Sequence, residues 1–150
     1  MDIASFRIDH RILDPGIYVS RIDGNVVTYD LRTRKPNMGD YMDKITMHSL
    51  EHMMATFLRN SEDAEHIIYF GPMGCQIGFY LLTTGLDNDA VLLRVKKALE
   101  QVIEYDGVIF GCSEKECGNY RNLNLSAAQL EAKRYLDILN AGKHDFKYKE

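Results

Sequence analysis

Residues 46–60 read Thr-Met-His-Ser-Leu-Glu-His-Met-Met-Ala-Thr-Phe-Leu-Arg-Asn, and the rest of the chain can be placed around this stretch. Its apolar residues recur at helical spacing, which predicts one helix with a buried side. At about 100° per residue, His48 and His52 lie roughly 40° apart around the axis and one turn apart along it. Two imidazoles can therefore reach one metal ion. Glu51 falls about 60° to the other side of His48, where it can meet a ligand on that metal as a general base.

A plainer explanation has to be weighed against the metal site. A histidine pair with a glutamate between the two is, taken alone, about as often part of a solvated face or of the core as it is a metal site. The order His-x-x-Glu-His is also the signature of the inverzincin peptidases, so it predicts metal binding and leaves the reaction open. Cys117 fits as the third ligand, because two histidines and a thiolate leave the open position typical of catalytic sites. A separate zinc site of Cys112 and Cys117 is the weaker alternative, since no second pair follows.

Composition sets the class of protein. The 150 residues, 45% hydrophobic and 27% charged, predict one soluble globular domain spanning 1–150. The net charge of −4 argues against nucleic acid or an anionic membrane as a partner. No apolar run approaches the ~18 residues of a membrane span, and the N-terminus lacks a signal-peptide core, so we expect a cytoplasmic protein. The odd count of three cysteines indicates reduced thiols.

The remaining elements follow from alternation, turn residues and helix caps. Strands are expected over 17–22 and 26–32, joined by the turn Asp23-Gly24-Asn25, and over 66–70 and 76–83. The run 107–111 is expected to form a last strand. Helices are expected after Asp43 or Thr46, after Asp87 or Asn88, and from a Ser126–Gln129 capping box to about Asn140. The fold class is α+β: one domain with a mostly antiparallel sheet covered by helices, and the metal site on a helix beside the sheet.

Cys75 is the second candidate for chemistry. It ends the sequence Gly71-Pro72-Met73-Gly74-Cys75, whose glycines and proline predict a tight turn that presents the thiol at the edge of the sheet. Without further context, a free cysteine between strands is more often a small buried hydrophobe.

Several motifs together resemble a known family. They are Ser5, Asp9-His10, Asp30-Leu31-Arg32 with Pro36-Asn37, His48-x-x-Glu51-His52, Pro72-Met73-Gly74-Cys75-Gln76-x-Gly78-Phe79-Tyr80, and Glu114-Lys115-x-Cys117-Gly118. In this order and at this spacing, they resemble the S-ribosylhomocysteine lyases, the LuxS family. The resemblance spans nearly the whole chain.

The resemblance implies a role for each candidate residue. His48, His52 and Cys117 would hold one Fe²⁺ per subunit, replaceable by Zn²⁺ or Co²⁺. Glu51 and Cys75 would be the acid/base pair, and Ser5, His10 and Arg32 would contact the small-molecule substrate S-ribosylhomocysteine. The family also implies a homodimer with its active sites at the subunit interface.

The implied reaction moves the substrate carbonyl from C1 to C2 and then C3, after which β-elimination expels homocysteine from C5. The other product, 4,5-dihydroxy-2,3-pentanedione, is the precursor of autoinducer-2 in quorum sensing, and homocysteine returns to methionine metabolism. A thiol near a metal cation has its pKa lowered from ~8.5, which suits Cys75 to proton transfer. A partly desolvated Glu51 suits proton abstraction.

The chain departs from the family pattern next to Cys75. Tyr69 and Gly71 stand where an acidic residue and a serine are common, and Ile77 stands where threonine is usual. Two other functions stay open at this stage. One is an inverzincin-type metallopeptidase, in which Glu51 activates a metal-bound water, and the other is a non-catalytic metal-binding protein whose fourth position is closed by a side chain.

Overall fold

The centre of the fold is an antiparallel sheet. The computed structural model describes residues 1–149, and within them the strands are β1 (Gly16–Asp23), β2 (Val26–Arg32), β3 (Ile67–Pro72) and β4 (Gly78–Thr84). Their order is β1-β2-β4-β3, and every neighbouring pair is antiparallel. The expected hairpin turn after Asp23 is confirmed, with Gly24 at φ +61°, a conformation that costs glycine no steric strain.

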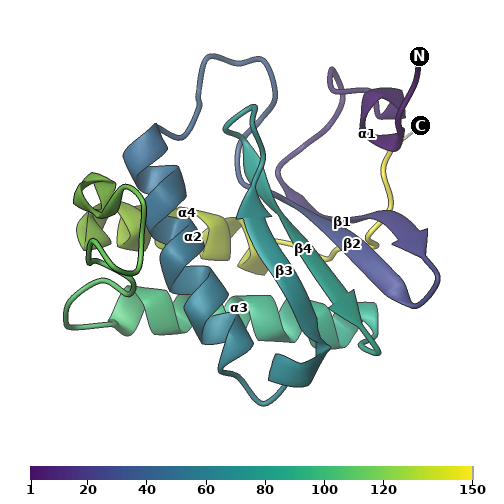
Figure 1. Cartoon of the computed structure of the whole chain (residues 1–150). Coiled ribbons are helices and arrows are strands. Elements are labelled where there is room, and N and C mark those ends of the chain that lie inside the picture. The colour runs from purple at the N-terminus through teal and green to yellow at the C-terminus, as the bar shows by residue number, and fades with distance from the viewer. Residues whose placement is uncertain (150) are drawn as a thin grey trace.

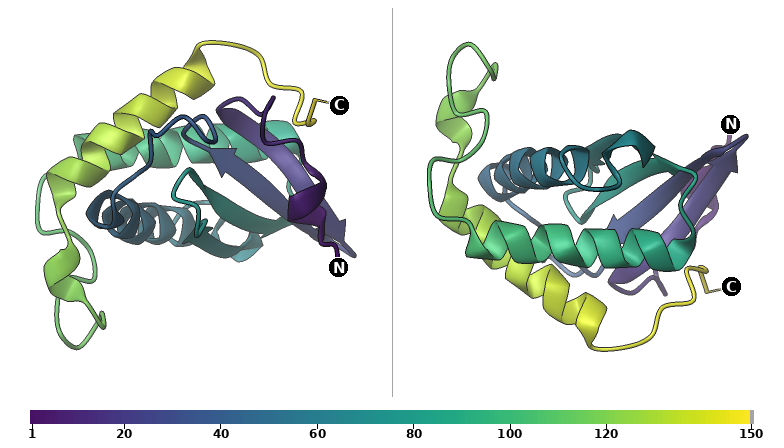
Figure 2. Two further views of the ribbon diagram at one scale, coloured as in Figure 1. Left: turned by 90° about the horizontal axis from the view of Figure 1, so that it is seen from above. Right: turned by 90° about the horizontal axis from the view of Figure 1, so that it is seen from below.

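Three long helices pack against one face of this sheet and against each other. They are α2 (Lys44–Arg59), α3 (Asn88–Glu104) and α4 (Leu125–Asn140). Figures 1 and 2 show α2 alongside β3, with α3 and α4 behind the sheet. The shorter elements are α1 (Ala4–Arg7) and the 3₁₀ turns η1 (Ala64–His66) and η2 (Tyr120–Asn122). The α+β prediction, with an antiparallel sheet covered by helices, is confirmed.

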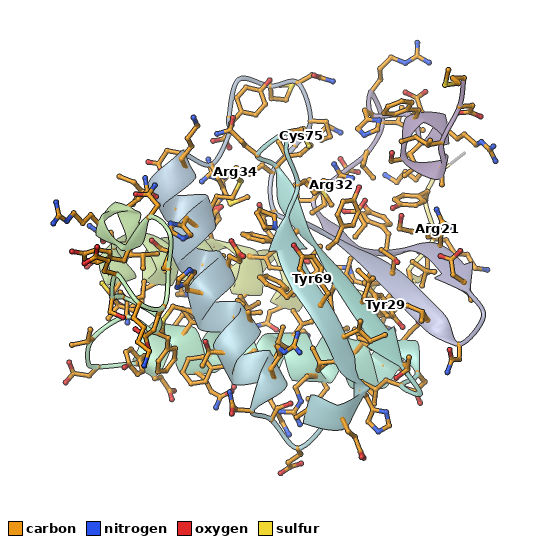
Figure 3. The ribbon with its side chains drawn as sticks, viewed as in Figure 1. Arg21, Tyr29, Arg32, Arg34, Tyr69 and Cys75 are labelled. Atoms are coloured by element: carbon orange, nitrogen blue, oxygen red, sulfur yellow. The ribbon has the colours of Figure 1, made fainter. Side chains whose placement is uncertain are left out.

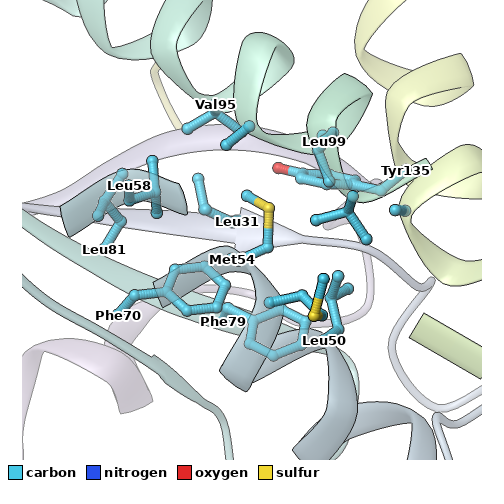
Figure 4. Packing of buried hydrophobic residues seen from close by; sticks show 14 of the residues in the cluster. Leu31, Leu50, Met54, Leu58, Phe70, Phe79, Leu81, Val95, Leu99 and Tyr135 are labelled. Carbon is cyan, nitrogen blue, oxygen red and sulfur yellow. The ribbon is translucent and has the colours of Figure 1, made fainter. Parts of the chain in front are cut away.

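The alternation of β2 and β4 separates a core face from an outer face. Tyr29 and Leu31 on β2, and Phe79 and Leu81 on β4, point into the core beneath the helices. Figure 4 shows this core, where side chains from three helices meet the strands; the labelled ones are Leu31, Leu50, Met54, Leu58, Phe70, Phe79, Leu81, Val95, Leu99 and Tyr135. The intervening residues of β2 and β4 therefore face outward, on the side where the N-terminal arm lies.

Side-chain caps fix where the helices begin. Asp43 accepts a hydrogen bond from the Thr46 backbone N–H at 2.7 Å and so starts α2, and Asp87 does the same for α3. No helix in the described part of the chain is long and apolar enough to cross a membrane.

Two sequence expectations about the last third of the chain are wrong. Residues 107–111 form a loop rather than a strand, because they lie beyond α2 on the side away from the sheet, where no strand edge is available (Figure 1). The cap of α4 is Asn124, which accepts from the Ala127 N–H at 3.0 Å, and not Ser126. Gln129 instead donates its amide to the carbonyls of Val102, Ile103 and Tyr105 at the end of α3.

Candidate active site

His48, His52 and Cys117 come together as a group of possible metal ligands. One ligand atom from each lies within 4.8 Å of the other two, and all three residues are half-buried. The Cys117 sulfur is 3.4 Å from Nε2 of His48, and the two imidazole rings lie 4.6 Å apart at 89°. The helical spacing of the histidines and the choice of Cys117 over a Cys112 pair are therefore reproduced in space.

Each histidine is oriented through its other ring nitrogen. Nδ1 of His52 lies 2.8 Å from the carbonyl oxygen of Phe110, and Nδ1 of His48 lies 3.2 Å from Oδ1 of Asn122. A carbonyl oxygen can only accept, so Nδ1 carries the proton in both rings and Nε2 keeps its lone pair. This is the usual arrangement around a metal-binding histidine. Sequence reasoning missed both partners; Phe110 contributes only its backbone, which no side-chain pattern signals.

The loop before η2 delivers the cysteine. The Cys117 backbone N–H donates to the Ser113 carbonyl at 3.0 Å, and the Asn119 N–H points at the Cys117 sulfur at 3.4 Å. Cys112 points elsewhere, with its sulfur 3.7 Å from the Tyr120 carbonyl.

The donor set fits a divalent transition metal. Two imidazole nitrogens and a thiolate suit Zn²⁺ or Fe²⁺ and are too soft for Mg²⁺ or Ca²⁺. Three protein ligands leave a coordination position for a substrate, as in catalytic sites. Glu51 lies half-buried on the same helix and directly precedes His52 in the sequence.

A second constellation lies on the outer face of the sheet. Cys75 is exposed in the turn between β3 and β4, in a pocket of about 410 Å³ lined by Ser5, Phe6, His10, Arg32, Met73, Gly74, Cys75 and Tyr80. Four residues predicted from the sequence, Ser5, His10, Arg32 and Cys75, therefore share one pocket. Figure 3 shows Cys75 at the tip of the β3–β4 turn and Arg32 close by at the end of β2.

Arg32 is held firmly in this pocket. Its guanidinium forms two hydrogen bonds with Asp30, at 3.0 and 2.5 Å, and both side chains are almost fully buried. Burial lowers the pKa of Arg32 and the Asp30 carboxylate raises it by more, so the group keeps its positive charge. The Arg32 cation and the Cys75 thiol therefore line the same pocket.

The two constellations lie apart within one chain. The histidines and Cys117 meet where α2 contacts the loop before η2, on the side of α2 away from the sheet (Figures 1 and 2). Among residues 1–149, the lining of the Cys75 pocket includes neither Glu51 nor a member of the histidine and cysteine group. The predicted acid/base partners, Glu51 and Cys75, thus stand on different surfaces of the chain.

The fold and the two constellations define a small α+β protein with a group of two histidines and a cysteine that could bind a metal and a separate pocket around a thiol. Residues 3–145 match the family described as S-ribosylhomocysteinase (LuxS). The chain is also 46% identical to an S-ribosylhomocysteine lyase of Finegoldia magna, over 92% of this chain and 91% of that protein. It is 44% identical to one of Borreliella afzelii (95% of each chain) and 47% identical to one of Desulfotalea psychrophila (89% and 87%).

The chain therefore belongs to the LuxS family of S-ribosylhomocysteinases. The family prediction made from the sequence motifs is confirmed, and with it the prediction of a carbon–sulfur lyase. These matches do not favour the peptidase or the non-catalytic metal-binding protein.

Proposed function

We propose that this protein cleaves S-ribosylhomocysteine to homocysteine and 4,5-dihydroxy-2,3-pentanedione. The observation that carries the proposal is that possible ligand atoms of His48, His52 and Cys117 lie within 4.8 Å of one another, while Nδ1 of each histidine is held by a different partner. We further propose that the ion is Fe²⁺, one per subunit, with Zn²⁺ or Co²⁺ as substitutes. When bound, the ion supplies a Lewis acid that polarises the substrate carbonyl and stabilises the negative charge that develops on its oxygen.

The chain's own residues move the protons. Each carbonyl shift removes a proton from the carbon beside the carbonyl and returns one to a neighbouring atom, and the elimination removes a proton from C4 as the thiolate leaves C5. Cys75, next to the Arg32 cation, is suited to taking and returning protons. Glu51, on the helix that carries both histidines, is suited to transferring protons next to the metal and to protonating the departing thiolate.

Substrate binding falls to the pocket around Cys75. Arg32, Ser5 and His10 offer a fixed cation, a hydroxyl and an imidazole to a polyhydroxylated chain. Arg32 is already paired with Asp30, so little of its side-chain entropy is lost when substrate binds.

Because the two constellations lie on different surfaces, we propose that a second copy of the chain completes the site. The Cys75 pocket of one subunit would face the histidines, Cys117 and Glu51 of its partner in a homodimer. The outer face of the sheet and the arm beside it carry exposed apolar side chains suited to such an interface, including Phe6 (74% exposed) and Tyr69 (50%).

Release of free thiol from S-ribosylhomocysteine tests the activity. Anaerobically prepared Fe²⁺ or Co²⁺ protein should release thiol in a reaction that depends on the metal and on Glu51. A folded, metal-loaded dimer that releases none would overturn the proposal. If thiol is released, the two products place the enzyme in homocysteine recycling and in supply of the autoinducer-2 precursor.

Mixing two inactive variants tests the shared site. If each site takes Glu51 from one subunit and Cys75 from the other, exchanging Glu51→Gln with Cys75→Ala subunits restores about a quarter of the sites. Each variant alone is the matched control. No recovery after complete subunit exchange would show that both residues must act from the same chain.

A further inference from the structure

Residues 144–149 form a strap along the free edge of the sheet. In this C-terminal strap (residues 144–149), the Phe146 carbonyl accepts a hydrogen bond from the Val19 N–H at 2.9 Å, and Phe146 pairs with Tyr18 in a parallel bridge. Phe146 itself is buried in the core. The strap therefore covers the edge strand β1 and is anchored there.

Tyr148 reaches from this strap over the outer face of the sheet. Its ring stacks on Tyr18, with centroids 4.9 Å apart and planes inclined by 18°. Its hydroxyl donates to Oδ2 of Asp30 at 2.8 Å. Burial, and then the nearby Asp30 carboxylate, raises the pKa of Tyr148, so the hydroxyl stays protonated near neutral pH and can act as a donor.

Asp30 connects Tyr148 to the Cys75 pocket. One carboxylate receives two hydrogen bonds from Arg32 and one from Tyr148, and Oδ2 is shared by both donors. The carboxylate is fully buried, so no solvent replaces a lost partner. The orientation of Arg32 in the pocket thus depends on a carboxylate that the strap also holds, through Oδ2.

We propose that Tyr148 is a positioning residue for substrate binding, which fixes Asp30 and through it aims the Arg32 guanidinium into the Cys75 pocket. The inference rests on the proposed function, in which Arg32 contacts the substrate. Without the phenol, Asp30 Oδ2 loses a neutral donor, and the carboxylate competes more strongly with substrate for the guanidinium.

Tyr148→Phe tests this, because it keeps the stacked ring and removes only the hydroxyl. We expect KM for S-ribosylhomocysteine to rise about fivefold, with kcat and metal content nearly unchanged in a protein that still folds cooperatively. Lys149→Ala is the matched control, since it removes the strap's exposed ion pair with Asp14 and leaves Asp30 untouched. An unchanged KM in Tyr148→Phe, or an equal rise in Lys149→Ala, would overturn the proposal.

A double-mutant cycle separates positioning from a general effect. In the Arg32→Lys background, which cannot form the paired hydrogen bonds of a guanidinium, Tyr148→Phe should raise KM no further. Additive effects would show that Tyr148 acts independently of Arg32, against the proposal.

A measurement without turnover keeps this test independent of the lyase activity. The alkylation rate of Cys75, read by peptide mass mapping in the metal-loaded protein, reports the positive charge beside the thiol. Tyr148→Phe should slow alkylation about twofold or more, because Asp30 then withdraws more of the Arg32 charge. An unchanged alkylation rate refutes the inference whether or not the protein releases thiol; slower alkylation in a protein that releases no thiol refutes only the lyase proposal.

Discussion

Gly111 lies directly against the imidazole of His52. A Cβ added at residue 111 would lie 2.8 Å from Nδ1 of His52, and Gly111 has φ +71°, which strains any other residue. This close approach allows the neighbouring Phe110 carbonyl to hold Nδ1. The glycine therefore sets the orientation of His52, one of the three proposed metal ligands, without being a ligand itself.

We expect Gly111→Ala to weaken metal binding by about tenfold or more, the usual cost of disturbing the hydrogen-bond partner of a ligand. Competition with a chromophoric chelator measures the affinity. Gly118→Ala is the control, because an added Cβ there meets nothing within 4 Å. Equal affinities of the Gly111 variant and the unsubstituted protein would show that the loop can move away at no cost.

Cys75→Ala should retain fold and metal and lose turnover, because Cys75 belongs to the outer pocket and not to the histidine and cysteine group. Metal content and thiol release, measured on the same sample, check this. Cys117→Ala is the matched contrast and should lose the metal. Substantial metal loss from the Cys75 variant, or full retention by the Cys117 variant, would contradict these assignments.

The part of the site that could be predicted from sequence is the part that local geometry determines. His48 and His52 are one helical turn apart, so their convergence follows from the helix alone. Cys117 lies far along the chain, and donor chemistry rather than pattern singled it out. The prediction of a strand at 107–111 was wrong because an apolar run indicates burial but does not indicate which element covers it. Here the run forms a loop beside α2 and supplies the Phe110 carbonyl that contacts His52.

The start of α4 and the location of Cys75 also depend on tertiary neighbours that a local sequence pattern does not show. Asn124 and Ser126 are both good caps, and only the position of Gln129 against the end of α3 decides between them. The motifs predicted Glu51 and Cys75 as partners. No sequence pattern within one chain could show that Glu51 lies on α2 with the histidines whereas Cys75 lies in the pocket on the outer face of the sheet.

Gln129→Ala should lower the free energy of unfolding by about 1–3 kcal/mol, because it leaves carbonyls at the end of α3 without their donor. Denaturant titration measures the loss, and Gln101→Ala, an exposed amide on α3, is the control. Turnover per bound metal should be unchanged in both variants. A Gln129 variant as stable as the control would mean that water takes over the donation.

Asp43 gives the helix that carries both histidines a dependence on pH. The hydrogen bond from the Thr46 N–H lowers the pKa of Asp43. The stabilisation that the Asp43 carboxylate gives the folded protein is therefore fully present above its unfolded pKa, about 4, and is lost as pH falls through the lower folded pKa. We expect Asp43→Ala to lower stability near neutral pH by about 1 kcal/mol and to flatten the decline in acid. Asp43→Asn should keep most of the neutral-pH stability and remove the acid dependence. Unfolding curves across the acid range measure both, and identical slopes for Asp43→Asn and the unsubstituted protein would contradict the assignment.

Tyr69 and Gly71, two of the positions where the sequence resemblance implies a departure from the family pattern, are coupled in space. The Tyr69 phenol lies over Gly71, so a Cβ on residue 71 would overlap with it. Tyr69 also lines a pocket together with Ser5 and Tyr80. Gly71→Ser alone should therefore displace the phenol and cost about 1 kcal/mol, whereas Gly71→Ser combined with Tyr69→Asp should cost less than the sum of the two single changes. Melting temperatures of the four proteins give the coupling, and KM shows whether the displaced ring reaches the Cys75 pocket. Strict additivity would mean that the phenol has another position of equal energy and that the two departures are independent.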